Sequence, residues 1–244
     1  MFEQQRHRKI FLPVVAFLVI VSVIIYFSDR LTLYLFTAAK YSKSKTPAMY
    51  VTPIAREIQR THKTVSSPYL LSYENIKLQI PWEFKEKSES IFSTFYVFRN
   101  KKGIVISQQG EDENFRQKLL DEGPLEVQKA KLIYGEENLK SEYAVSSLIL
   151  HTTPDQFSIS KPAPENEKII PLLMLKGLYS VYGNAIYKFN LDNVLGFQFG
   201  NPQTTKNIYV HLFNDEDQIF RLHFIAATQA EIDHILSSIE FYPK

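Results

Sequence analysis

Residues 220–241 read FRLHFIAATQAEIDHILSSIEF, and this stretch decides how the domain is built. Apolar and polar residues alternate from Phe220 to Phe224, which predicts a half-buried β-strand. Thr228 and Glu231 have the spacing of a capping box, the side-chain pair that satisfies free backbone groups at a helix start. The apolar residues that follow fall at i, i+3, i+4 and i+7, on one helix face: Ile232, Ile235, Leu236 and Ile239. The sequence therefore predicts a strand followed by a helix that packs on a sheet.

Further strands are predicted on both sides of this stretch. Residues 185–189, 194–199 and 208–213 precede the last strand, at 218–226, and residues 214–217 (NDED) form a hairpin loop before it. Near the start of the domain, residues 76–80 (IKLQI) alternate cleanly, and residues 93–99 and 103–107 form a second hairpin. Between the two groups of strands, helical patterns cover residues 112–120, 127–135 and 139–150. Strands, then helices, then strands with a closing helix predict an α+β fold: an antiparallel β-sheet packed with helices, an α/β sandwich.

Two further helices are expected. Thr52-Pro53 has the pattern of an N-cap followed by proline at the first helical position, which predicts a short helix to about Arg60. Residues 169–175, from Ile169 to Leu175, form a dense apolar run, with Pro171 at the helix start and Gly177 as its C-cap. A buried helix is one interpretation of residues 169–182, and a surface for a partner or for lipid is the other.

The two ends of the domain resemble the PsbP/Mog1-like domains. Residues 73–84 (YENIKLQIPWEF) hold an early strand that leads to a Pro-Trp turn. At the other end, the last strand leads to a helix and a Ser-x-x-Phe-like tail, whose place is taken by residues 237–241 (SSIEF). The resemblance covers these ends and not residues 136–182. It implies a non-enzymatic accessory or binding domain.

The segment from Ile10 to Phe27 (residues 10–27, IFLPVVAFLVIVSVIIYF) contains no charged residue. Eighteen helical residues extend about 27 Å, close to the thickness of the hydrocarbon core of a bilayer. Because the run is apolar on every face and Asp29 and Arg30 follow it, a membrane helix is favoured over a core helix or a cleaved signal peptide. We therefore expect a single-pass membrane protein that contacts the lipid bilayer through this segment.

Charge divides the chain into two parts. Residues 1–70 hold 10 Lys and Arg against 3 Asp and Glu, whereas residues 71–244 hold 18 against 23. A basic segment beside a membrane helix faces anionic headgroups, and the mildly acidic body argues against nucleic-acid binding. We expect a cytoplasmic tail (1–9), a transmembrane helix (10–30), a basic interfacial segment and linker (31–69) and a globular domain (70–244). The positive flank before the helix favours a cytoplasmic N-terminus and an extracytoplasmic domain at the inner (cell) membrane.

Common catalytic signatures are missing from the sequence. The chain has no cysteine and no Walker loop, Gly-x-Gly-x-x-Gly, His-Glu-x-x-His or Gly-x-Ser-x-Gly motif. His211 and His223 fall on neighbouring predicted strands and on one face, where two imidazoles and a carboxylate could bind a metal. His151 with Asp155 could form a general base. Both sets are better interpreted as structural: a polar or helix-covered sheet face for the first pair, and contact with helix carbonyls for His151.

Acidic clusters at residues 111–113 and 215–217 lack the spacing of a calcium loop and suit a helix cap and a hairpin tip. We therefore assign no catalytic, cofactor-binding or metal-binding residue and expect no enzymatic activity. The favoured function is a membrane-anchored, extracytoplasmic interaction or assembly domain with an envelope protein partner. A domain that binds a lipid or another small apolar ligand is the first alternative, and an unrecognised hydrolase is the second.

Overall fold

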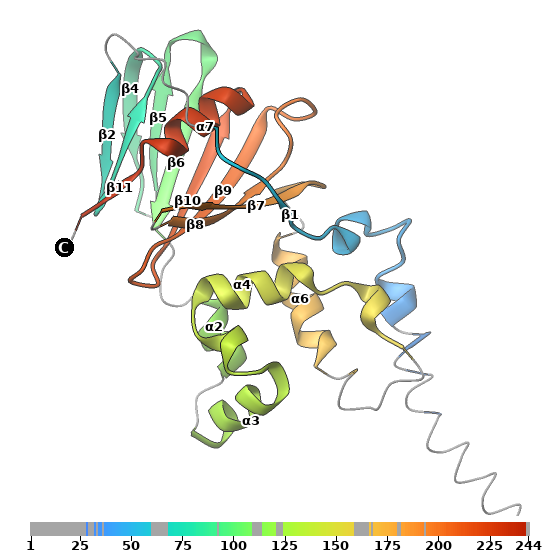
Figure 1. Ribbon diagram of the computed structural model, residues 1–244. Coiled ribbons are helices and arrows are strands. Elements are labelled where there is room, and N and C mark those ends of the chain that lie inside the picture. The colour runs from blue at the N-terminus through green and yellow to red at the C-terminus, as the bar shows by residue number, and fades with distance from the viewer. Residues whose placement is uncertain are drawn as a thin grey trace, which may run out of the picture.

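The computed structural model describes residues 28, 32, 34–35, 37–59, 68–91, 93–108, 114–120, 124–158, 166, 168–179, 182–192 and 194–242. The expected membrane segment, residues 10–27, lies outside these ranges. Within them, none of the helices combines the length and the apolar character that a membrane crossing requires. The described chain has the α+β architecture that the sequence predicts (Figure 1).

An eight-stranded sheet forms the centre of the molecule. Its strands follow the order β1-β7-β8-β9-β10-β6-β5-β4, and every neighbouring pair is antiparallel except β1 with β7. The strands are β1 (Ile54–Ala55), β4 (Phe84–Glu89), β5 (Thr94–Phe98), β6 (Gly103–Gln108), β7 (Ile186–Leu191), β8 (Val194–Phe199), β9 (Asn207–Phe213) and β10 (Ile219–Ile225). Asn100, with a φ of 65°, lies in the turn η2 (Arg99–Lys101) between β5 and β6, in a left-handed conformation that asparagine tolerates well.

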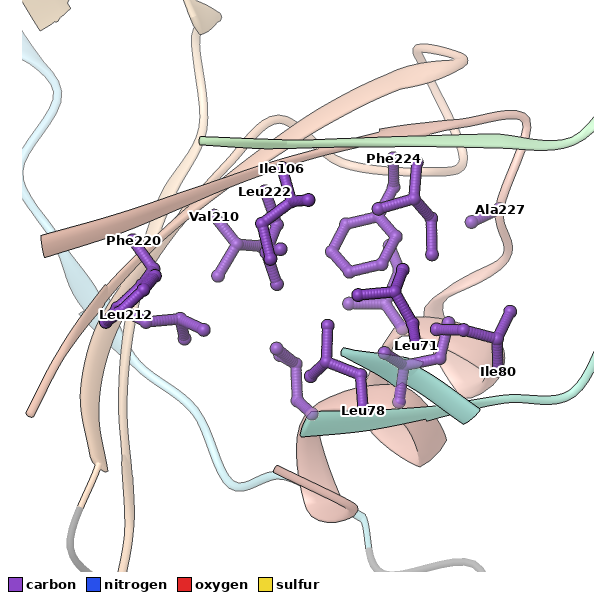
Figure 2. Packing of buried hydrophobic residues seen from close by; sticks show 14 of the residues in the cluster. Leu71, Leu78, Ile80, Ile106, Val210, Leu212, Phe220, Leu222, Phe224 and Ala227 are labelled. Atoms are coloured by element: carbon purple, nitrogen blue, oxygen red, sulfur yellow. The ribbon is translucent and has the colours of Figure 1, made fainter. Parts of the chain in front are cut away.

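A second, three-stranded sheet packs with helix α7 (Gln229–Ser237) on one face of the large sheet. It comprises β2 (Tyr69–Tyr73), β3 (Ile76–Ile80) and β11 (Glu240–Phe241) in the order β11-β3-β2. Figure 2 shows Leu71 and Leu78 of the small sheet facing Leu222 and Phe224 of the large one, and all four are at most 1% exposed. The capping box of α7 is confirmed, since Thr228 and Glu231 each bond to the other's backbone N–H.

Helices cover the opposite face of the large sheet toward β8, β9 and β10. These are α2 (Phe115–Leu120), α3 (Pro124–Tyr134), α4 (Glu142–His151) and α6 (Ile169–Tyr179), with the short 3₁₀ turns η1 (Pro47–Tyr50), η4 (Glu137–Leu139) and η5 (Pro154–Gln156). Alternate residues of β9 face opposite ways: Val210 joins the core under α7, whereas Phe213 joins the core under the helices. The sheet is thus buried on both faces over these strands, with the helices gathered at one end of the molecule (Figure 1).

The expected helix from Pro53 to about Arg60 is wrong. Ile54 and Ala55 are extended and pair in parallel with Tyr187 and Lys188 of β7. Hydrogen bonds to a strand more than 130 residues away outweigh the local preference of the Thr-Pro pair, as tertiary contacts commonly do.

The expected C-cap at Gly177 is also wrong, because α6 continues through it to Tyr179. Tyr179 is 3% exposed and stacks on Phe199 of β8, with ring centroids 5.5 Å apart. That packing keeps the last turn helical beyond the glycine.

Strands β2, β4 and β11 were not expected. The sequence of β4 (FKEKSE) carries charges throughout, as suits the outer strand of a sheet.

Candidate functional site

Residues 41–59, which follow the expected membrane helix in the chain, are part of the folded unit. Residues 51–59, which we call the strap, run along the outer edge of β7, where the Arg56 N–H donates to the Lys188 carbonyl at 2.9 Å. Just before the strap, Tyr41 and Met49 are 9% and 2% exposed and pack against Ile169 and Leu173 of α6. Residues well before 70 therefore pack against the domain.

Arg56 joins the strap to the C-terminal helix. Its guanidinium donates to Asp233 Oδ1 of α7 at 2.7 Å and to Gln198 Oε1 of β8 at 2.8 Å. The side chains of Arg56 and Asp233 are only 13% and 5% exposed. Gln229 of α7 completes the group by donating to Asp233 Oδ1 at 2.8 Å. Removing one partner of a charge pair at this depth strongly destabilises the fold. The group therefore holds the strap to the sheet and to α7.

Lys176 holds the other end of the strap. Its ammonium lies inside the helical layer, 1% exposed, and donates to the carbonyls of Val51, Leu150 and Thr152 at 2.7–2.8 Å. Burial lowers the pKa of Lys176 from 10.5 to about 8. The Leu150 carbonyl belongs to the last turn of α4, whose carbonyls lack helical partners. One side chain thus joins α6, the end of α4 and the start of the strap.

Described residues line two hollows on the surface that bear on function. One, of about 500 Å³, lies where the strap leaves the edge of β7 and is lined by Arg56, Ile58, Tyr143, Phe189 and Asp192 among others. The other, of about 600 Å³, lies between Tyr182 and Tyr209 and the loop after β8, with a lining of aromatic, amide and hydroxyl groups. Ligand sites in proteins have volumes of this order. The first hollow combines apolar and charged side chains beside a strand edge, and the second has no charged side chain.

His211 and His223 each pack against aromatic rings. His211 and His223 share a face of the sheet, as predicted, but His211 lies opposite Arg221 and is 2% exposed beneath Tyr179. Burial lowers the pKa of His211 to about 3, so its imidazole is neutral. His223 stacks on Tyr209 with ring centroids 4.2 Å apart. In the described ranges no group of three or more histidine or carboxylate side chains is placed to hold a metal ion.

His151 has the structural contact that the sequence suggests. Its Nδ1 lies 2.7 Å from the Ser147 carbonyl, one turn back in α4. It lines neither of the two hollows, and the same holds for His211. The hydrolase alternative stays a prediction that these two hollows do not test.

The acidic hairpin tip supports the helical layer. Asp217 Oδ1 accepts from the Glu142 N–H at 2.6 Å at the start of α4, and Arg116 lies 3.4 Å from Asp217 Oδ2. Glu142 is fully buried, and its Oε1 accepts from the Arg116 N–H at 2.7 Å. Burial, as the main cause, raises the pKa of Glu142 to about 7. The other acidic cluster, residues 111–113, lies outside the described residues.

Among the described residues, sequence patterns missed the buried charges of Glu142, Lys176 and Asp233 and the largely buried charge of Arg56. Only Lys176 has a visible signal, because it is the one charged residue in the eleven-residue apolar helix α6. The partners of Arg56 and Glu142 lie too far along the chain to be inferred from spacing.

No protein-family model matches the chain, and no curated protein matches it. The resemblance to PsbP/Mog1-like domains, drawn from the two ends of the domain, stays a prediction.

Proposed function

We propose that the chain is a single-pass membrane protein whose extracytoplasmic domain binds and positions an envelope protein partner, without chemistry of its own. The observation that carries the proposal is the packing of residues 41–59. Residues 10–27 are apolar enough to remain in a bilayer, and the chain reaches Tyr41 of the folded unit only 14 positions after Phe27. The domain is therefore held close to the bilayer and in a restricted orientation, as a platform for assembly requires.

The hollow beside the strap is where we place the partner. The edge of β7 is covered by only two residues of β1, and Asn190, farther along the strand, is exposed and lines the hollow. An uncovered strand edge offers backbone groups that another chain can pair with. Ile58 and Leu191, both partly exposed, add apolar surface, whereas Lys188 and Asp192 offer charges of both signs. The accessory role implied by the PsbP/Mog1-like resemblance belongs to the same proposal.

A topology reporter fused after Lys244 tests the placement. We expect a phosphatase reporter, which folds only outside the cytoplasm, to be active and a fluorescent reporter that requires the cytoplasm to be dark. The reverse pattern would put the domain on the other side of the membrane. Recovery of the full-length protein, with its N-terminus intact, from the soluble fraction without detergent would refute the anchor itself.

Photo-crosslinking tests the partner site. A photoreactive amino acid at Asn190 should give a discrete crosslinked product in intact cells. The matched control is Ser88, an exposed residue of β4 at the opposite edge of the large sheet. Equal products from both positions, or none from Asn190, would contradict the assignment of this edge.

A further inference from the structure

Helix α6 buries its charged residue and exposes apolar residues, which is the opposite of the pattern on a helix that faces water. Its one charged side chain, Lys176, is buried, whereas Met174 and Leu178 are 59% and 53% exposed. Pro171 is exposed on the same side, so the outward residues recur at i, i+3 and i+7 and form one apolar stripe. A surface helix in water normally shows polar groups on this side. The outward stripe of α6 therefore suits an apolar environment.

The position of α6 in the fold indicates which environment that is. The helix packs against η1 and η5, and η1 belongs to the segment that follows the expected membrane helix. The Tyr34 ring lies 6.2 Å from the ring of Phe157, just after η5. Only seven positions separate Tyr34 from Phe27, so the chain between them can reach at most about 25 Å. The elements around α6 are therefore the part of the domain nearest to the end of the apolar segment.

The charges around this region match a lipid surface. Lys40, Lys43 and Lys45 are all exposed beside the helical layer, and Leu35 is 57% exposed just before them. Apolar side chains flanked by lysines are the composition of segments that lie in the headgroup region of anionic membranes. A soluble protein partner would not require this basic fringe.

We propose that the outward stripe of α6 (Pro171, Met174 and Leu178) is a second lipid contact, seated in the headgroup region of the same bilayer that holds residues 10–27. This inference rests on the proposed membrane anchor. It assigns α6 to the membrane and leaves the edge of β7 for the protein partner. The domain then has two attachments to the bilayer, which together fix its tilt as well as its height.

The absence of cysteine from the chain makes the test direct. Single cysteines at Met174 and at Leu178 are labelled with an environment-sensitive fluorophore in the full-length protein. Each labelled protein is reconstituted into phosphatidylcholine vesicles with a quarter phosphatidylglycerol, with and without brominated acyl chains. We expect a blue-shifted emission at both positions and loss of most of that emission when the brominated lipid is present.

Two control positions separate the possible failures. A label at Val19, in the expected membrane segment, reports the anchor, and a label at Ser88 on β4 reports a surface away from the bilayer. Quenching at Val19 without quenching at Met174 or Leu178 overturns the lipid contact and leaves the anchor standing. No quenching at Val19 overturns the anchor, and the inference with it. A blue shift at Met174 that brominated lipid does not quench identifies a protein environment and also overturns the inference.

A charge variant provides a second readout. The double substitution Met174→Asp and Leu178→Asp changes only exposed side chains, so the fold should persist. We expect labels placed at Pro171 in this background to lose their blue shift and their quenching, because carboxylates are repelled by the anionic surface. Unchanged quenching in the double variant would contradict the proposed contact.

Discussion

Replacing Lys176 with methionine tests whether one buried ammonium joins α6, α4 and the strap. Three hydrogen bonds from a charged donor, at 2.7–2.8 Å, contribute about 1.5–3 kcal/mol each. Against them stands the burial of the charge, which lowers the pKa of Lys176 from 10.5 to about 8 and so costs about 3 kcal/mol at neutral pH. Methionine removes both contributions and leaves three carbonyls unpaired. We expect a net loss of about 3 kcal/mol in the free energy of unfolding.

The measurement is urea unfolding of the full-length protein in detergent at pH 7, followed by circular dichroism. The control is Lys140→Met, because Lys140 is exposed and pairs only with Glu137 at the surface. Such a pair contributes less than about 1 kcal/mol. If Lys176→Met were as stable as Lys140→Met, the three carbonyls would not depend on the ammonium, and the reasoning would be refuted.

The same residue gives a pH dependence with a definite sign. Above about pH 8 the folded protein releases the Lys176 proton, whereas the unfolded chain keeps it to about 10.5. The unfolded state then holds more protons, so the stability of the wild type should rise between these pH values. The methionine variant should lack this rise.

The remaining predictions concern four other sites. Because burial raises the pKa of Glu142 to about 7, stability should fall as the pH rises from about 4.5 to 7, and Glu142→Gln should remove this fall in urea titrations. Because the pKa of His211 is lowered to about 3, stability should fall as the pH drops from about 6.5, and His211→Phe should remove that loss. Gly196→Ala would put a Cβ 2.3 Å from the Phe189 ring and 2.9 Å from a backbone carbonyl, so we expect a loss of about 1–3 kcal/mol, seen as a lower Tm; an unchanged Tm would contradict this packing. Asp233→Ala leaves Arg56 buried without its carboxylate and should cost about 3–5 kcal/mol, with faster proteolysis in the strap; a strap that stays protected would refute its attachment to α7.

Local patterns in the sequence predicted the elements whose stability is local. The alternation of residues 76–80 and the capping box at Thr228 and Glu231 each depend on neighbours a few positions apart, and both are confirmed. Strand β1 could not be predicted in this way, because two residues acquire their conformation only from β7. The tail of α6 beyond Gly177 is likewise held by the packing of Tyr179 on the sheet.

The candidate sites show the same division. The shared face of His211 and His223 follows from strand alternation, which is a local property. Their environments do not, because Tyr179 and Arg221, from separate elements, decide that His211 is buried and neutral. The hollow beside the strap depends on where β1 ends against β7, and this is a consequence of tertiary structure alone.

The parallel pairing of β1 with β7 has a mechanical consequence. Tension on the N-terminal side of Tyr41 must pass through the Lys176 contacts before it reaches the two paired residues of β1. The backbone hydrogen bonds between β1 and β7 run across the strand. A force along the strand therefore loads them together, and they cannot open one at a time. After β1, the next contact to bear the force is the ion pair between Arg56 and Asp233 of α7. In a protein held at one end by a membrane, a pulling force would therefore have to break the contacts of the strap before it could unfold the sandwich.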